Sequence, residues 1–161
     1  MRRLIIFSAL ILLTRISVMA NGIGITNIQR GHNLKLVSSS IDVQVENQIA
    51  ITKTMQTFKN ETDSTVSVKY AFPLRDDESA IQLKWYIDEL WYLANIGVNA
   101  DSGGPGTPTN TATKFKKYLG ETAMMFPIDQ ELDAGDEMIV EFQYVTLLPY
   151  ANGVVSYTYP N

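Results

Sequence analysis

Apolar and polar residues alternate along most of this chain, which is the pattern of β-strands that bury one face. The clearest stretch is Val66–Phe72, where every second side chain is apolar and those between them are small or polar. Pro73 follows directly and cannot donate a hydrogen bond to a sheet, so we expect the strand to stop there. We also expect the remaining strands to pack on the sheet that this segment begins.

Further strands are predicted on both sides of this segment. They are Leu34–Leu36 with Ile41–Glu46, Ile49–Phe58, Ile81–Asp88, Leu90–Ile96, Lys114–Tyr118, Thr122–Ile128, Met138–Tyr144 and Val154–Tyr159. In Ile49–Phe58 the alternation is less clean, because Lys53 shares a face with two isoleucines, and we expect an edge strand. Turns are predicted at Asn47-Gln48 and Asn152-Gly153. Asp101–Thr113, rich in Gly, Pro and Thr, is predicted to be a loop.

About eight or nine strands without a predicted helix indicate an all-β fold, an antiparallel β-sandwich preceded by a signal peptide. The expected divisions are a signal peptide at residues 1–20, a leader or edge segment at residues 21–33, and one β-sandwich domain at residues 34–161.

The start of the chain has the features of a secretory signal peptide. A basic beginning precedes the apolar run Leu4–Leu13, and Val18-Met19-Ala20 offers small residues for cleavage after Ala20. The run is too short for a membrane span of ~20 residues, and Arg15 prevents its extension. We therefore expect a mature chain without a transmembrane span that is secreted, periplasmic or displayed at the cell surface.

Charge and cysteine content narrow the function classes. The chain has 17 acidic and 13 basic residues, which gives a formal net charge of −4. The charged residues within 1–20 are all arginines, so removal of the signal peptide makes the chain more acidic. So acidic a protein is not expected to bind nucleic acid. Because the sequence has no cysteine, a secreted domain of this length must be held together by its apolar core rather than by disulfides.

Four short motifs occur at characteristic places along the chain. They are Phe58-Lys59-Asn60, Tyr70-Ala71-Phe72-Pro73-Leu74, Gly135 before the strand that ends at Tyr144, and Tyr157-Thr158-Tyr159-Pro160. Together they resemble the vault protein inter-alpha-trypsin (VIT) domain. The resemblance extends over roughly Leu34–Pro160. It implies a non-enzymatic, extracytoplasmic interaction module.

The chain departs from the pattern of this family in its middle. VIT domains usually carry a helical E-K-x-x-A-x-x-x-Y segment, and the corresponding residues Ile96–Thr111 do not show it. Many family members continue into a von Willebrand A domain with a metal site, whereas this sequence ends at Asn161. Metal-dependent adhesion therefore has no residues here to support it.

The sequence shows no catalytic constellation, so we expect neither an enzyme nor a cofactor. Nucleophilic catalysis needs a base beside the nucleophile, and the only histidine, His32, lies in a poorly patterned segment. Gly103-Gly104-Pro105-Gly106 lacks the lysine and the following helix of a phosphate-binding loop. Carboxylate pairs for glycoside cleavage are present in number, but spacing along the chain does not place two of them together.

Two acidic clusters and one sequon are expected to be polar turns. Asp76-Asp77-Glu78 is explained as a charged turn without a metal ion. Asp129–Glu137 does not match an EF-hand loop, because Ala134 stands at the position of the required glycine and Val140 at the position of the bidentate glutamate. Asn60-Glu61-Thr62 matches a glycosylation sequon, which we interpret as a turn.

Aromatic residues supply the candidate binding surface. Trp85 shares the predicted inward face with Ile81 and Leu83, so we expect it in the core. Trp91 and Tyr92 are adjacent and must point to opposite sides of a strand, so one of them is predicted to be exposed and to contact a partner.

Three functions follow from these observations. The first is an extracytoplasmic interaction or adhesion module that contacts a protein partner or an adjoining domain. The second is a carbohydrate-binding or glycan-active β-sandwich that uses exposed aromatic residues and acidic turns. The third is an N-terminal structural part of a larger secreted protein with a von Willebrand A-like domain.

Overall fold

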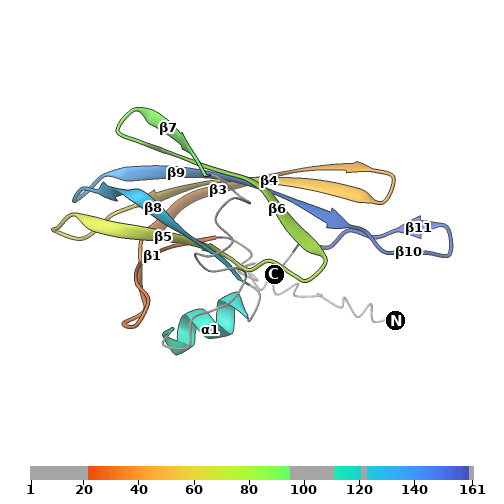
Figure 1. Ribbon diagram of the computed structural model, residues 1–161, viewed down its shortest axis with the longest axis horizontal. Coiled ribbons are helices and arrows are strands. Elements are labelled where there is room, and N and C mark those ends of the chain that lie inside the picture. Colours follow the sequence, from red (N-terminus) through yellow and green to blue (C-terminus); the bar gives the residue numbers. More distant parts are fainter. Residues whose placement is uncertain (1–21, 95–110, 121–122, 160–161) are drawn as a thin grey trace, which may run out of the picture.

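The computed structural model describes residues 22–94, 111–120 and 123–159. Nine of the described strands form two antiparallel sheets that pack face to face (Figure 1). The large sheet has the order β3-β4-β9-β6-β7, and the small sheet has the order β2-β1-β5-β8. The predicted all-β antiparallel sandwich is therefore confirmed.

The bounds of the elements are as follows. In the large sheet they are β3 (Lys35–Glu46), β4 (Ile49–Lys59), β9 (Glu137–Leu147), β6 (Glu78–Ile87) and β7 (Leu90–Leu93). In the small sheet they are β1 (Ile23–Asn27), β2 (His32–Asn33), β5 (Val66–Phe72) and β8 (Met124–Leu132). Helix α1 (Thr113–Leu119) precedes β8, and β10 (Tyr150–Ala151) and β11 (Val154–Val155) form a separate hairpin.

The core lies between the sheets and is rich in aromatic side chains. Phe72 of β5 lies 4.8 Å from Phe142 and 5.3 Å from Tyr144 of β9, measured between ring centroids. These residues belong to the alternating series that predicted the strands, and all of them are fully buried. β5 ends at Phe72, directly before Pro73, as expected. Two-residue periodicity thus identified both faces that form the core.

The turns also follow the sequence. The chain reverses at Asn47-Gln48 and at Asn152-Gly153, and the asparagines there have positive φ angles of 53°. Asparagine tolerates this left-handed conformation better than most residues, which is why these dipeptides favour tight hairpins. Both predicted turns are confirmed.

The expectation that Ile49–Phe58 is an edge strand was wrong. The segment forms β4, which pairs with β3 on one side and with β9 on the other. Lys53 is tolerated on the isoleucine face because that face of the large sheet is open to solvent. The edge strand is β3 instead.

The prediction of a strand at Lys114–Tyr118 was also wrong, because these residues belong to helix α1. Phe115 and Leu119, four residues apart, are buried against Ile25 of β1 and Ala71 of β5. The helix therefore covers the side of the small sheet that faces away from the core (Figure 1). A second apolar layer outside the sandwich is what stabilises so short a helix.

Ile81 was expected on the inward face of β6 but is 48% exposed. The register between β6 and β9 shifts between Ala80 and Gln82, which is the signature of a β-bulge. The bulge turns Ile81 outward, while Leu83 and Trp85 keep their inward positions. Trp85 is in the core, as predicted.

The expected leader or edge segment contains β1 and β2, which both belong to the small sheet. Cleavage after Ala20, the Gly-Pro stretch of Asp101–Thr113 and the end of the strand expected at Leu90–Ile96 lie outside the described residues. In the described part of the chain, no helix is long and apolar enough to cross a membrane.

Candidate interaction surface

The outer face of the large sheet carries large apolar side chains, whereas part of its inner face is polar. In β4 the exposed side chains include Ile49, Ile51 and Met55, and the side chains that point inward between them are small or polar. This is the reverse of the arrangement expected for a strand with one buried face. The apolar residues of β4 are therefore available for contacts other than those of the core.

The inward polar residues of β4 have specific partners. Tyr70 donates its hydroxyl hydrogen to Oε1 of Gln56 at 2.7 Å, and Nε2 of Gln56 donates to the carbonyl oxygen of Gly22 at 3.4 Å. Oγ1 of Thr52 and the hydroxyl of Tyr157 share a hydrogen bond of 2.8 Å. Burial raises the pKa of Tyr70 well above its ordinary value, so this hydroxyl keeps its proton and acts as a donor. These bonds hold both ends of the described chain against β4.

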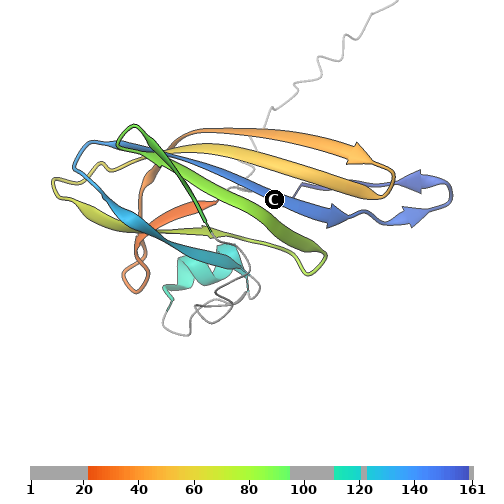
Figure 2. The ribbon, with the colours of Figure 1, turned by 45° about the horizontal axis from the view of Figure 1, so that its top comes forward.

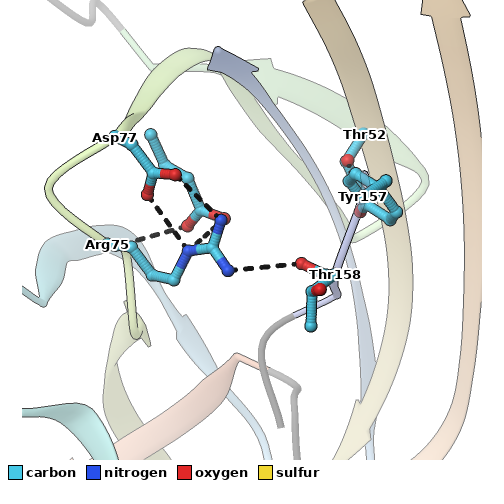
Figure 3. Close-up of polar contacts among 6 residues, drawn as sticks. Thr52, Arg75, Asp77, Tyr157 and Thr158 are labelled. Carbon is cyan, nitrogen blue, oxygen red and sulfur yellow. Dashed lines mark hydrogen bonds and ion pairs between the residues drawn. The ribbon is translucent and has the colours of Figure 1, made fainter. Parts of the chain in front are cut away.

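The C-terminal segment is fixed by a second polar cluster, at the turn between β5 and β6 (Figure 3). Nε and Nη2 of Arg75 donate to the two carboxylate oxygens of Asp77 at 3.1 and 3.0 Å, and Nη1 donates to the carbonyl oxygen of Thr158 at 3.4 Å. Nε of Arg75 also lies 3.4 Å from Oε1 of Glu78, which is buried. Asp77 and Glu78 of the first acidic cluster therefore bind an arginine of the same turn.

The second acidic cluster likewise has a structural role at a turn. The carboxylate of Asp133 accepts a hydrogen bond from the hydroxyl of Thr65 at 2.7 Å. The backbone carbonyl oxygen of Asp136 accepts one from the backbone N–H of Asn60 at 2.9 Å. Within the three described ranges, no group of His, Cys, Asp or Glu side chains is arranged to hold a metal ion. His32 lies exposed in β2.

Asn60, the first residue of the sequon, is completely buried. Its Nδ2 lies 2.8 to 3.1 Å from the carbonyl oxygens of Ser64, Leu132 and Asp133, and its Oδ1 accepts hydrogen bonds from Thr62. A glycan cannot be attached to this nitrogen in the folded domain, because the nitrogen is enclosed and engaged. The sequon is a turn stabilised by its own asparagine, as interpreted from the sequence.

Trp91 and Tyr92 lie on opposite faces of β7, as their adjacent positions predicted. Tyr92 points inward and stacks on Trp85, with ring centroids 5.9 Å apart and an interplanar angle of 12°. Trp91 points outward, opposite Tyr86 of β6, and is 49% exposed. Of the two predicted partner-binding residues, Trp91 is therefore the accessible one, and Tyr92 mainly supports the core.

Residues that the sequence analysis did not single out surround Trp91. The ring of Tyr86 lies 5.3 Å from the ring of Trp91, and Nζ of Lys84 lies 4.8 Å from its centroid. Leu93, opposite Lys84, is 67% exposed, and Ile139 of β9 lies opposite Tyr86 on the same face. We call these five residues the Trp91 surface. The alternation in β6 could have predicted part of this surface, because it places Lys84 and Tyr86 on the face of the strand that Trp85 does not use. The pairing of β6 with β7 depends on the turn at Asp88-Glu89.

A band of polar contacts borders the Trp91 surface. Nζ of Lys84 lies 3.1 Å from Oε1 of Glu141, whose side chain is 8% exposed. Nε2 of Gln143 donates to Oε1 of Glu141 at 3.1 Å and to Oε1 of Gln82 at 3.2 Å. Lys84 is thus held between a nearly buried carboxylate and the face of an indole ring, an arrangement that fixes the orientation of Trp91.

The fold and this surface define a small antiparallel β-sandwich that exposes an ordered aromatic cluster on the outer face of one sheet. Residues 36–96, which run from β3 past the end of β7, match the sequence model of the vault protein inter-alpha-trypsin domain. That part of the chain, which includes Trp91, is therefore similar to the VIT family. The match supports the resemblance at Phe58–Asn60 and Tyr70–Leu74, whereas the motifs at Gly135 and Tyr157–Pro160 lie outside the matched residues. No curated protein matches the chain.

Proposed function

We propose that this chain is a non-enzymatic interaction module that acts outside the cytoplasm and contacts a protein partner or an adjoining domain of a larger protein through the Trp91 surface. The observation that carries the proposal is the exposure of Trp91 and Leu93, at 49% and 67%, on a sheet face that the core does not use. The similarity of residues 36–96 to VIT domains supports it.

The chemistry of the Trp91 surface suits a protein contact. Trp and Tyr contribute most to binding free energy when they lie at the centre of an interface and are surrounded by polar residues that exclude water. Trp91 and Tyr86 have this position, and the Lys84–Glu141 pair lies at their border. Because Lys84 already holds the indole ring, less side-chain entropy is lost when a partner covers it.

The same observations favour a protein over a carbohydrate. A sugar ring needs a free aromatic face for stacking, and the ammonium group of Lys84 lies against the ring of Trp91 at 4.8 Å from its centroid. A glycan-binding function is therefore the alternative outcome of the test.

Capture from cell-surface extract with Trp91→Ala and a matched control tests the proposal. Tyr150→Ala is the control, because Tyr150 is 61% exposed and belongs to the separate β10–β11 hairpin. We expect the wild-type protein and Tyr150→Ala to retain the same protein partner and Trp91→Ala to lose it. Equal capture by all three proteins would contradict the proposed surface.

Two further measurements separate the alternatives. Binding to a glycan array that is lost on Trp91→Ala would replace the protein partner by a carbohydrate. Turnover of a glycoside or ester that disappears on His32→Ala or on removal of one acidic pair would show that the protein is an enzyme.

A further inference from the structure

The sandwich has one long strand edge that is regular over most of its length. β3 has 12 residues, all of them exposed, and none of the described strands pairs with its outer edge. The other edges of the two sheets are short or interrupted: β7 has four residues, β2 has two, and β8 contains Pro127. Natural proteins block long edges with proline, inward-pointing charges, β-bulges or covering elements, because free N–H and C=O groups invite another strand. The bulge of β3 lies near its start, between Leu36 and Ser38, and the pairing with β4 is regular from Ser38 to Glu46.

Three apolar side chains on the inward side of β3 are also exposed. Ile41, Val43 and Val45 are 46%, 36% and 53% exposed, although they share a face with buried residues of β4. Among the described strands, β3 is paired on one side alone, whereas the buried residues of β4 lie between β3 and β9 (Figure 2). From Leu36 to Glu46 the strand contains neither proline nor lysine that would oppose pairing.

We propose that β3 pairs with β3 of a second copy of this chain, antiparallel and about a two-fold axis at Ile41. The two large sheets then form one continuous sheet. This is a surface separate from the Trp91 surface, and it does not depend on the function proposed above.

The register follows from which residues of β3 share a face. The pairing of β3 with β4 has a bulge between Leu36 and Ser38, so that Leu36, Ile41 and Val45 lie on the inner face while Lys35 and Glu46 lie on the outer face. Residues directly opposite each other in antiparallel strands lie on the same face of the sheet. With Val37 left unpaired at the bulge, as it is in the pairing with β4, centring on Ile41 satisfies this rule and pairs the other residues from Lys35 to Glu46.

In this register the strand is complementary to itself. Lys35 lies opposite Glu46 of the second copy, and by symmetry this pair of opposite charges occurs at both ends. Leu36 lies opposite Val45, Ile41 lies opposite Ile41, and Asp42 lies opposite Ser40. No two like charges face each other, whereas centring on Asp42 would place two carboxylates together. The complementarity of both charge and apolar surface is why we infer a second copy rather than an unrelated strand.

Lys35 can serve this contact although its Nζ already lies 2.6 Å from Oε1 of Glu61. Both side chains are exposed, and an ammonium group has three donors.

Introduced cysteines test the register directly, because the chain has none of its own. Ile41→Cys would bring two thiols together at the axis, with Cα atoms about 4.5 to 5.5 Å apart, within the reach of a disulfide. Val43→Cys is the matched control, since it lies on the same face of the same strand but its two copies would be roughly 13 to 14 Å apart. Both variants are expressed from the full sequence, reduced, purified and then oxidised.

We expect Ile41→Cys to form a disulfide-linked dimer on the order of tenfold faster than Val43→Cys at the same protein concentration. Equal rates, or no dimer in either variant, would overturn the proposed pairing.

Sedimentation equilibrium provides an independent test with a second matched pair. Ile41 and Ile51 have similar exposures, 46% and 41%, and each is replaced by lysine. Ile41 lies on the edge strand β3, whereas Ile51 lies on β4, which is paired on both sides. Ile41→Lys should abolish the dimer because two ammonium groups meet at the axis, and Ile51→Lys should retain it. The reverse result would place the contact on the outer face and contradict the proposal, as would a wild-type protein that stays monomeric.

Charge exchange tests the pair at the ends. Lys35→Glu and Glu46→Lys should each weaken dimerisation roughly tenfold, and the double variant should restore it, because two opposed pairs are involved. Absence of restoration would exclude this register. Trp91→Ala should leave dimerisation unchanged, so that failure of the pairing and failure of the proposed partner contact are distinguished.

Discussion

Asn60 holds the end of β4 against the turn between β8 and β9. Its Nδ2 is within hydrogen-bonding distance of three carbonyl oxygens, and the side chain is fully buried. Asn60→Ala leaves those carbonyls without this donor inside the protein, so we expect the free energy of unfolding to fall by roughly 2 to 4 kcal/mol. Urea denaturation followed by circular dichroism measures this loss.

The adjacent residue supplies the control for Asn60. Glu61 is exposed and forms a surface ion pair with Lys35. Glu61→Ala should change the free energy of unfolding by less than about 1 kcal/mol. Similar losses in the two variants would contradict the structural role assigned to Asn60.

Glu78 should make stability depend on pH. Burial raises the pKa of Glu78 above its ordinary value of 4.5, an effect that contacts with Arg75 partly offset. The folded state therefore binds this proton more tightly than the unfolded state. The resulting stabilisation of the folded state is fully present below the pKa of the unfolded state. It is lost as the pH rises through the higher pKa of the folded state.

Glu78→Gln removes this titration. We expect the free energy of unfolding of the wild type, minus that of Glu78→Gln, to decrease between about pH 4 and pH 7. Urea denaturation at constant ionic strength across this range measures the difference. A difference that stays constant, or increases with pH, would be inconsistent with the raised pKa.

At the scale of elements, helix α1 depends on two buried anchors. Phe115 and Leu119 pack against β1 and β5 in a cluster separate from the main core. Phe115→Ala leaves a cavity under a helix that is too short to be stable alone, so we expect a loss of about 3 kcal/mol in the free energy of unfolding. Lys117→Ala, on the exposed side of the same helix, is the control and should have little effect.

The sequence predicted most strands because alternation records which side chains face the core. It did not place β4 correctly, because β4 puts Ile49 and Ile51 outward and Thr52 inward, and only the pairing with the distant β9 explains that choice. The helix was missed although Phe115 and Leu119 have helical spacing, because the Gly-Pro-rich stretch before them indicated a loop followed by short strands.

The candidate surface was predictable only in part. Because neighbouring residues of a strand point to opposite faces, the sequence was sufficient to predict that Trp91 and Tyr92 lie on different sides of the sheet. That Lys84 and Tyr86 lie beside Trp91 depends on the β6–β7 register, which the turn at Asp88-Glu89 sets. The contact of Arg75 with Thr158 joins residues far apart in the sequence and has no local signal.

At the scale of the whole molecule, the two tryptophans report on different sides of one sheet. Trp85 is 3% exposed and contacts the small sheet, where its Nε1 donates to Oε1 of Gln130 of β8 at 2.6 Å. Trp91 lies on the outer face of the large sheet and has no part in the core between the sheets. The emission of each tryptophan can be isolated, because the sequence contains only these two.

Single-tryptophan variants should show whether the sandwich unfolds as one unit. Trp91→Phe leaves the buried Trp85, whose emission should shift to longer wavelength on unfolding, and Trp85→Phe leaves the exposed Trp91, whose emission should change less. Because β6 and β7 share a core with the small sheet through Trp85 and Tyr92, we expect fluorescence and circular dichroism to give the same urea midpoint within each variant. An earlier midpoint for Trp91 fluorescence would show that the β6–β7 hairpin opens independently, and a hairpin that opens so readily could not hold the Trp91 surface in the order that its proposed contact requires.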